Sequence, residues 1–242
     1  MIKPLIRKAL GHKTLGAIDY FRSPGLKNPF GGPFNGQQFR QKIFLELIEL
    51  LRPQAIIETG TYRGATTAFL HNASGLPVYT IEIDPRRYAY SKTRFLLNRN
   101  IFLHLGDSRE FLNAILADEK LRRKKLFFYL DAHWGDDLPL QEEIEIVFRN
   151  CPQAAVMVDD FRVPDDDGYR YDTYKNGKSL TLESLVPSAT SGLTFYFPAM
   201  RSEIETGAKR GCAIIALEPE VTAILEKAST LKPFRRRLKI SR

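Results

Sequence analysis

The chain has 242 residues, 43% of them hydrophobic and 26% charged, so it can bury a core of ordinary size, and we expect one globular domain. Its net charge of +8 is concentrated in residues 1–28 and 227–242, so a basic groove through the middle of the fold is not implied. The two cysteines, Cys151 and Cys212, are too few for a disulfide framework, lack metal-ligand spacing and indicate a reducing compartment.

The termini carry no predicted membrane anchor. No run reaches the roughly 18 apolar residues of a membrane span, and the first ten residues are too short and too interrupted for a secretory signal. We therefore expect a cytoplasmic protein. Residues 2–10 could form an amphipathic helix on an anionic membrane, although packing against the domain is the favoured use. The basic termini could also contact nucleic acid.

Strands and helices are expected to alternate through most of the chain. After a loop rich in glycine, proline and asparagine at 26–38, apolar residues at helical spacing predict a helix at 39–51. The expected strands are 54–58, 78–83, 101–105, 126–131 and 154–159, and the expected helices lie near 64–72, 86–98, 108–118 and 139–150. This alternation, with nearly continuous apolar strands, predicts an α/β fold with a parallel sheet covered on both faces.

The pattern changes in the last quarter of the chain. Residues 193–200 and 211–218 predict two strands without a crossover helix between them, which favours an antiparallel hairpin at the sheet edge. We divide the chain into an N-terminal basic segment and gating loop, 1–38, and a single domain, 39–242. Within that domain we expect a substrate lid at 162–178 and a basic tail at 227–242.

The segment IIETGTYRGATTAFL, residues 56–70, changes from strand to helix at Glu58, Gly60 and Gly64. In a doubly wound sheet, ligands bind at this kind of turn, beyond the carboxyl ends of the strands. Gly60 would let the backbone approach a ligand, and Gly64 would let the helix pack tightly on the strand. The dinucleotide and P-loop glycine patterns are absent, and a carboxylate repels phosphate. The turn therefore favours a ligand with an ammonium or sulfonium centre.

Acidic side chains also end the second and third expected strands. Glu82 lies 22 residues after Gly60, where an acid commonly accepts hydrogen bonds from ribose hydroxyls. Asp107 can accept from an adenine amino group, and Ser108 can cap the following helix. Together these positions indicate an adenosine with a positively charged tail. Simpler readings remain open: a helix-cap partner for Glu58, a solvated strand end for Glu82 and a helix N-cap for Asp107.

The fourth and fifth strands bring further polar groups to the same edge: Asp131 and His133, then Asp159 and Asp160. Three unpaired carboxylates would repel one another, so either cations from elsewhere in the chain or a hard divalent metal must neutralise them. Oxygen ligands without thiolates favour Mg²⁺, with Mn²⁺ or Ca²⁺ as alternatives. We predict that Asp131, Asp159 and Asp160 bind the metal. A metal-free polar site and purely structural acids remain the alternatives.

These motifs resemble those of class I S-adenosylmethionine-dependent methyltransferases, within them the metal-dependent O-methyltransferases related to catechol O-methyltransferase. ETGTYRG resembles that branch's Glu-x-Gly-x-Tyr-x-Gly loop and TIEIDP its second-strand motif, and the similarity spans roughly residues 54–161. The resemblance implies a Rossmann-like doubly wound sheet of seven strands, ordered 3-2-1-4-5-7-6 with the last strand antiparallel. It implies cofactor contacts from Glu58, Gly60, Thr61, Tyr62, Gly64, Glu82, Asp107, Ser108, Asp131 and Trp134.

The sequence departs from the catechol branch after the fourth strand. That branch has Asp-His-Trp-Lys, with the lysine as general base, whereas residues 131–135 here are DAHWG. His133 can replace the lysine because an imidazole titrates near neutrality, and Asp131 is the other candidate base. Macrolide-sugar O-methyltransferases look similar in having Asp and His here and an Asp-Asp pair after strand five. His133 as a fourth metal ligand, or merely packed under the loop, stays open, and Trp134 could shield the cofactor or fill core.

We therefore predict metal-assisted O-methylation of a small-molecule hydroxyl, on a sugar, a catechol-like compound or a natural product. Tyr169, Tyr171 and Tyr174 of the expected lid could stack on the acceptor or pack the lid onto the domain. A homo-oligomer is possible. The alternatives are an RNA methyltransferase that uses the basic termini, a cephalosporin hydroxylase-like enzyme and a non-catalytic cofactor-binding protein.

Overall fold

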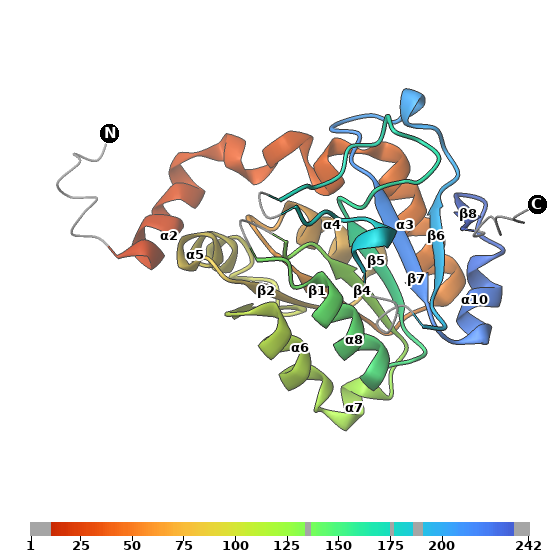
Figure 1. Cartoon of the computed structure of the whole chain (residues 1–242). Coiled ribbons are helices and arrows are strands. Elements are labelled where there is room, and N and C mark those ends of the chain that lie inside the picture. Colours follow the sequence, from red (N-terminus) through yellow and green to blue (C-terminus); the bar gives the residue numbers. More distant parts are fainter. Residues whose placement is uncertain (1–10, 134–136, 175–176, 186–190, 235–242) are drawn as a thin grey trace, which may run out of the picture.

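The computed structural model describes residues 11–133, 137–174, 177–185 and 191–234, which form a domain around one mixed sheet (Figure 1). The strand order is β3-β2-β1-β4-β5-β7-β6-β8. The strands are β1 Ala55–Thr59, β2 Val78–Glu82, β3 Ile101–Leu105, β4 Leu126–Leu130, β5 Ala155–Asp159, β6 Thr194–Pro198, β7 Cys212–Ala216 and β8 Leu231–Pro233. Strands β1 to β5 are parallel, and β7 runs antiparallel to β5 and β6. The predicted Rossmann-like order is confirmed, with β8 added.

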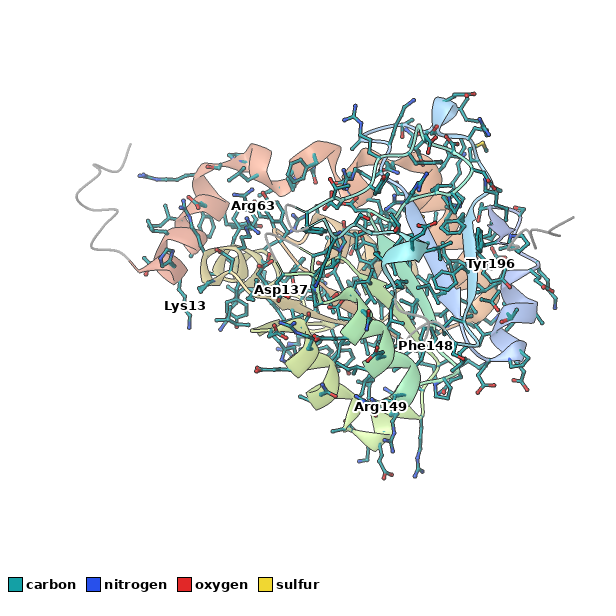
Figure 2. All side chains as sticks on the ribbon, viewed as in Figure 1. Lys13, Arg63, Asp137, Phe148, Arg149 and Tyr196 are labelled. Atoms are coloured by element: carbon teal, nitrogen blue, oxygen red, sulfur yellow. The ribbon has the colours of Figure 1, made fainter. Side chains whose placement is uncertain are left out.

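Helices cover both faces of the sheet (Figure 1). Alternate residues of β1 point to opposite faces, so that Ala55 and Ile57 join one buried cluster and Ile56 joins the other. The first cluster contains buried residues of three helices, α6 Ser108–Leu116, α7 Glu119–Arg122 and α8 Leu140–Asn150. The second contains buried residues of α3 Gln38–Leu51, α4 Ala65–Ser74 and α10 Pro219–Leu225. Phe148 of the first cluster and Tyr196 of the second are labelled in Figure 2. These two buried clusters hold the strand ends in place.

At the N-terminal end of the described chain, α2 His12–Arg22 packs on α5 Pro85–Arg94. The close approach requires Gly16, since a Cβ there would meet the carbonyl oxygen of Arg86 at 2.1 Å. The Arg86 guanidinium also pairs with the Asp19 carboxylate at 2.6 Å. Residues 2–10, considered above as a membrane-surface helix, lie outside the described residues. No helix within the described ranges is long and apolar enough to cross a membrane.

The alternating strands and helices are confirmed, with shifts of a few residues at their ends. Two elements near the C-terminus are not predicted from the sequence, namely α10 and β8. Strand β8 lies in the range assigned to a basic tail, yet it pairs with β6, and the next residue, Phe234, donates its N–H to the Phe195 carbonyl at 2.7 Å. Three residues are too few to show a period, so only the tertiary pairing reveals them. The remainder of that tail, 235–242, lies outside the description.

The predicted gating loop, 26–38, is anchored rather than free. Its short 3₁₀ turns end at the start of α3, where the carboxylate of Glu205 accepts the backbone N–H groups of Phe39 and Arg40 at 3.1 and 3.2 Å. Ala208 donates its N–H to the Asn35 carbonyl at 3.0 Å. The loop between β6 and β7 therefore fixes the position of the N-terminal loop, and the two loops lie together beside the ends of the strands.

Candidate functional site

A cavity of about 450 Å³ lies along the carboxyl ends of the parallel strands. Its walls come from the segments that follow β1 to β5, from the N-terminal loop and from the loop between β6 and β7. Asp137, labelled in Figure 2, is among the lining residues. This is the edge at which doubly wound sheets bind their ligands. Of the predicted cofactor contacts, Gly60, Thr61, Tyr62, Glu82, Asp107, Ser108 and Asp131 line the cavity.

The two glycines of the first turn serve different neighbours from those expected. Gly60 has φ 87°, and a Cβ there would meet the carbonyl oxygen of Asp131 at 2.2 Å. Its small size thus permits the approach of the chain after β4. Gly64 has φ 71°, and a Cβ there would lie 2.5 Å from the ring of Phe95. Gly64 therefore accommodates the end of α5, not the packing of α4 on its strand, and it is not among the lining residues.

Glu58 is fully buried and does not line the cavity, in contrast to its expected place beside the ligand. Its Oε2 accepts hydrogen bonds from the hydroxyls of Thr67 and Thr80 at 2.5 and 2.6 Å, while Oε1 has no partner among the described residues. Burial raises the pKa of Glu58 to about 7, against the opposing effect of the two hydroxyls. The Glu58 carboxyl group therefore links the start of α4 to β2 below the cavity floor and does not contact the cavity.

Glu82, at the end of β2, faces the cavity as predicted. Its Oε2 accepts the N–H of Tyr62 at 2.6 Å and its Oε1 accepts that of Asp84 at 2.8 Å. These bonds fix the carboxylate and leave each oxygen a further lone pair. Burial raises the pKa of Glu82 despite these two bonds. Next to it, Ile83 lines the cavity although the residue is 66% exposed to solvent, a feature that sequence reasoning missed.

The turn after β3 completes this end of the cavity. Gly106 has φ 151° and lines the cavity. Among the described residues, a Cβ at this position would contact only Ile81, at 3.9 Å, so a larger side chain here would project into the cavity. Asp107 caps α6, accepting the N–H of Arg109 at 2.8 Å, and it also pairs with the guanidinium of that residue at 2.7 Å. These hydrogen bonds with Arg109 lower the pKa of Asp107. The expectation that Ser108 caps the helix is wrong, because Asp107 occupies the cap and Ser108 is the first helical residue.

At the opposite end, four side chains converge. The Nε2 atom of His133 lies 3.6 Å from Asp131 Oδ1, 3.7 Å from Asp160 Oδ2 and 4.0 Å from Asp172 Oδ2. The His133 side chain is only 3% exposed, and Nε2 has no hydrogen-bond partner among the described residues. One atom from each of Asp131, His133 and Asp160 lies within 4.8 Å of the others, close enough to share a metal ion.

The electrostatics of this cluster follow from burial and proximity. Burial raises the pKa of Asp131, against the opposing charge of His133. Burial disfavours a charged His133 ring, but the neighbouring carboxylates outweigh it and raise the pKa of His133. Asp160 has φ 54°, a left-handed conformation that is uncommon outside glycine and frequent at functional sites.

Two arginines neutralise acids at this edge, and sequence reasoning anticipated such cations without locating them. Arg40 of α3 and Asp159 form a buried ion pair, each side chain 1% exposed. Asp159 also accepts the Tyr129 hydroxyl at 2.6 Å. These partners place Asp159 outside the cluster around His133, unlike its predicted role as a metal ligand. Arg210 donates to Asp160 at 2.6 Å and to Asp172.

The expected lid is mostly irregular where it is described, and two of its three tyrosines pack onto the domain. Tyr169 is 2% exposed and donates its hydroxyl to the Met200 carbonyl at 3.0 Å. Tyr174 is partly buried against the first core cluster. Tyr171 lies under the Arg162 guanidinium, 5.9 Å from ring to cation. Packing therefore accounts for Tyr169 and Tyr174. Trp134 falls outside the described residues.

No protein-family model and no curated protein matches the chain. Among solved structures, an O-methyltransferase from Bacillus cereus in complex with SAH matches with a TM-score of 0.55 and 15% identity, over 86% of this chain and 92% of that one. The SAH-bound methyltransferase PaMTH1 from Podospora anserina matches with a TM-score of 0.52 and 11% identity, over 84% of this chain and 88% of that one.

The O-methyltransferase TomG from Streptomyces achromogenes, involved in tomaymycin synthesis and in complex with SAM, has a TM-score of 0.52 and 16% identity, over 86% of this chain and 90% of that one. At these identities the likeness defines the fold. The chain has the Rossmann-like α/β fold of these methyltransferases.

Proposed function

We propose that this chain is an S-adenosylmethionine-dependent O-methyltransferase that acts on a hydroxyl of a small molecule with the aid of a divalent cation. One observation carries the proposal. A single cavity joins Glu82 and Asp107, at the ends of β2 and β3, to Asp131, His133 and Asp160, at the ends of β4 and β5. A cofactor with a ribose and a positive centre can thus lie beside a group able to take a proton.

The cofactor end of the cavity suits an adenosine. The fixed carboxylate of Glu82 can accept both ribose hydroxyls, and the exposed Ile83 offers an apolar surface to a base. Gly106 leaves room that any larger residue would fill. The volume of about 450 Å³ lies within the range of small-molecule sites.

The acceptor end suits a hydroxyl that must lose a proton. Asp131, His133 and Asp160 supply two oxygen donors and one nitrogen donor, a set that favours Mg²⁺, with Mn²⁺ or Ca²⁺ as alternatives. A bound cation would lower the pKa of the acceptor hydroxyl. The second oxygen of Asp131, or His133 where it does not bind the cation, would hold the proton of the acceptor hydroxyl. The cofactor would supply the methyl group from its sulfonium centre and leave as S-adenosylhomocysteine, and the fixed walls of the cavity would exclude water and align the two reactants. The neutralising arginines, Arg40 and Arg210, support a metal-free version of the same site.

The test begins with calorimetric titration of S-adenosylmethionine into the purified protein, with Mg²⁺ and with a chelator. Transfer of a labelled methyl group to catechols and glycosides is then measured under both conditions. We expect cofactor binding in both and methyl transfer only with Mg²⁺. Absence of cofactor binding overturns the proposal as a whole. Equal turnover with the chelator overturns only the role of the cation.

A further inference from the structure

Asp172 belongs to the expected lid, 162–178, yet it lines the cavity beside the cluster around His133. Its backbone N–H donates to the carbonyl of Asp160 at 3.1 Å, and its own carbonyl accepts the N–H of Leu180 at 3.0 Å. The first bond holds this lid residue against the segment that follows β5, and the second ties it to the chain at Leu180. Its side chain is 32% exposed, so one part of it faces the cavity.

Arg210 orients the carboxylates of Asp160 and Asp172 in the same way. Its Nε donates to Asp160 Oδ1 and its Nη2 to Asp172 Oδ1, so the guanidinium bridges the two side chains through matching oxygens. The second oxygens of both then face His133 Nε2, at 3.7 and 4.0 Å. Each distance is too long for a good hydrogen bond. The buried, unpartnered Nε2 atom consequently points at oxygens that it does not bind directly.

This spacing is what a shared cation requires. Two atoms that each lie about 2.1 Å from one ion are separated by about 3 to 4.2 Å. The distances from His133 Nε2 to the three carboxylate oxygens, 3.6 to 4.0 Å, fall in that range. Asp172 lies outside the group of Asp131, His133 and Asp160, whose ligand atoms all lie within 4.8 Å of one another, so its side chain would have to turn towards the other two carboxylates to share the ion. With all three carboxyl groups ionised and His133 neutral, as metal ligands must be, the one guanidinium of Arg210 leaves an excess of negative charge that a divalent ion would balance.

We infer that Asp172 is a further ligand of the divalent cation, so that the cation is held by Asp131, His133, Asp160 and Asp172. The inference rests on the cation of the proposed function and assigns it a ligand from the lid. Asp172 thereby takes the place predicted for Asp159, which Arg40 neutralises. With His133 engaged, the second oxygen of Asp131, 3.4 Å from the Tyr129 hydroxyl, remains to take the proton. Cation binding would also fix the lid to the strand ends.

The experiment is titration of Mn²⁺ into the cofactor-free protein, with free Mn²⁺ measured by electron paramagnetic resonance. The variant is Asp172→Asn, which keeps an oxygen for Arg210 but removes the charge. The matched control is Asp167→Asn, because Asp167 lies in the same segment with its side chain 86% exposed. Asp172→Ser serves as a second variant if the asparagine variant does not fold. S-adenosylmethionine affinity of each variant reports on the integrity of the fold.

We expect Asp172→Asn to weaken Mn²⁺ binding about tenfold or more, and Asp167→Asn to leave it within about twofold, because loss of a charged ligand lowers affinity. If the unchanged protein binds Mn²⁺ and the Asp172 variant binds it equally well, the inference is wrong and the cation site stands without Asp172. If the unchanged protein binds no Mn²⁺, both the inference and the cation's role in the proposed function fall. Cofactor binding, measured separately, would still stand.

Discussion

Replacement of Arg40 by methionine should destabilise the protein severely, because Arg40 neutralises a carboxylate that has no access to water. The side chains of Arg40 and Asp159 are each 1% exposed. Arg40 also donates to the backbone carbonyls of Arg210 and Gly211, the latter at 2.8 Å. Methionine fills a similar volume but removes every one of these donors.

The size of the effect follows from those contacts. Removal of one partner of a buried ion pair costs about 3–5 kcal/mol, because the other charge stays buried without compensation. The two carbonyls that lose a donor add about 1 kcal/mol each. Since the free energy of unfolding of a single domain is about 5–15 kcal/mol, Arg40→Met should bring the protein close to unfolding.

Urea denaturation followed by circular dichroism measures this loss. The double variant Arg40→Met/Asp159→Asn removes the buried charge as well and should recover at least half of the lost stability. Arg123→Met is the control, since the Arg123 side chain is 80% exposed and, within the described ranges, forms an ion pair only with Glu119 four residues earlier. Its effect should stay below about 0.5 kcal/mol. A loss below about 1 kcal/mol in Arg40→Met, or a double variant no more stable than the single one, would refute the reasoning.

Three further predictions concern the strand ends. The pKa of Glu58 is raised from 4.5 to about 7 in the folded, cofactor-free protein. Its contribution to stability is therefore complete below about pH 4.5 and is lost as the pH rises towards 7, a fall of about 3 kcal/mol. Glu58→Gln should abolish most of that fall in urea denaturation at pH 5 and pH 8, and an unchanged pH dependence would contradict the assignment. Gly60 has φ 87°, and a Cβ there would lie 2.2 Å from the Asp131 carbonyl oxygen, so Gly60→Ala should lower both the melting temperature and the affinity for S-adenosylmethionine. If the variant keeps both values, the chain after β4 can move aside. Glu82→Gln should weaken S-adenosylmethionine binding about tenfold in calorimetry with little change in melting temperature, and unaltered affinity would remove Glu82 from the cofactor site.

Local sequence patterns predicted the sheet because each element carries its own signal. The apolar runs at β1, β2, β4 and β5, with helical periods between them, require a parallel sheet covered on both faces. Glu82, Asp131 and His133 could be placed in the site because each lies at the end of a strand or within three residues of it, and the carboxyl ends of parallel strands share one edge. Strand β8 could not be predicted, since its pairing with β6 is its only defining feature.

The sequence by itself placed Glu82, Asp107, Asp131 and His133 at the cavity edge, since each lies at or just after the end of an apolar run that forms a parallel strand. The tertiary structure alone decided which partner each acid has. Asp159 and Asp160 are adjacent in the chain, yet one is neutralised by Arg40 from α3 and the other by Arg210 from beyond the lid. Contacts between residues 50 or more positions apart leave no local pattern, because they depend on how helices and loops pack around the sheet. The same packing brings Asp172 beside His133.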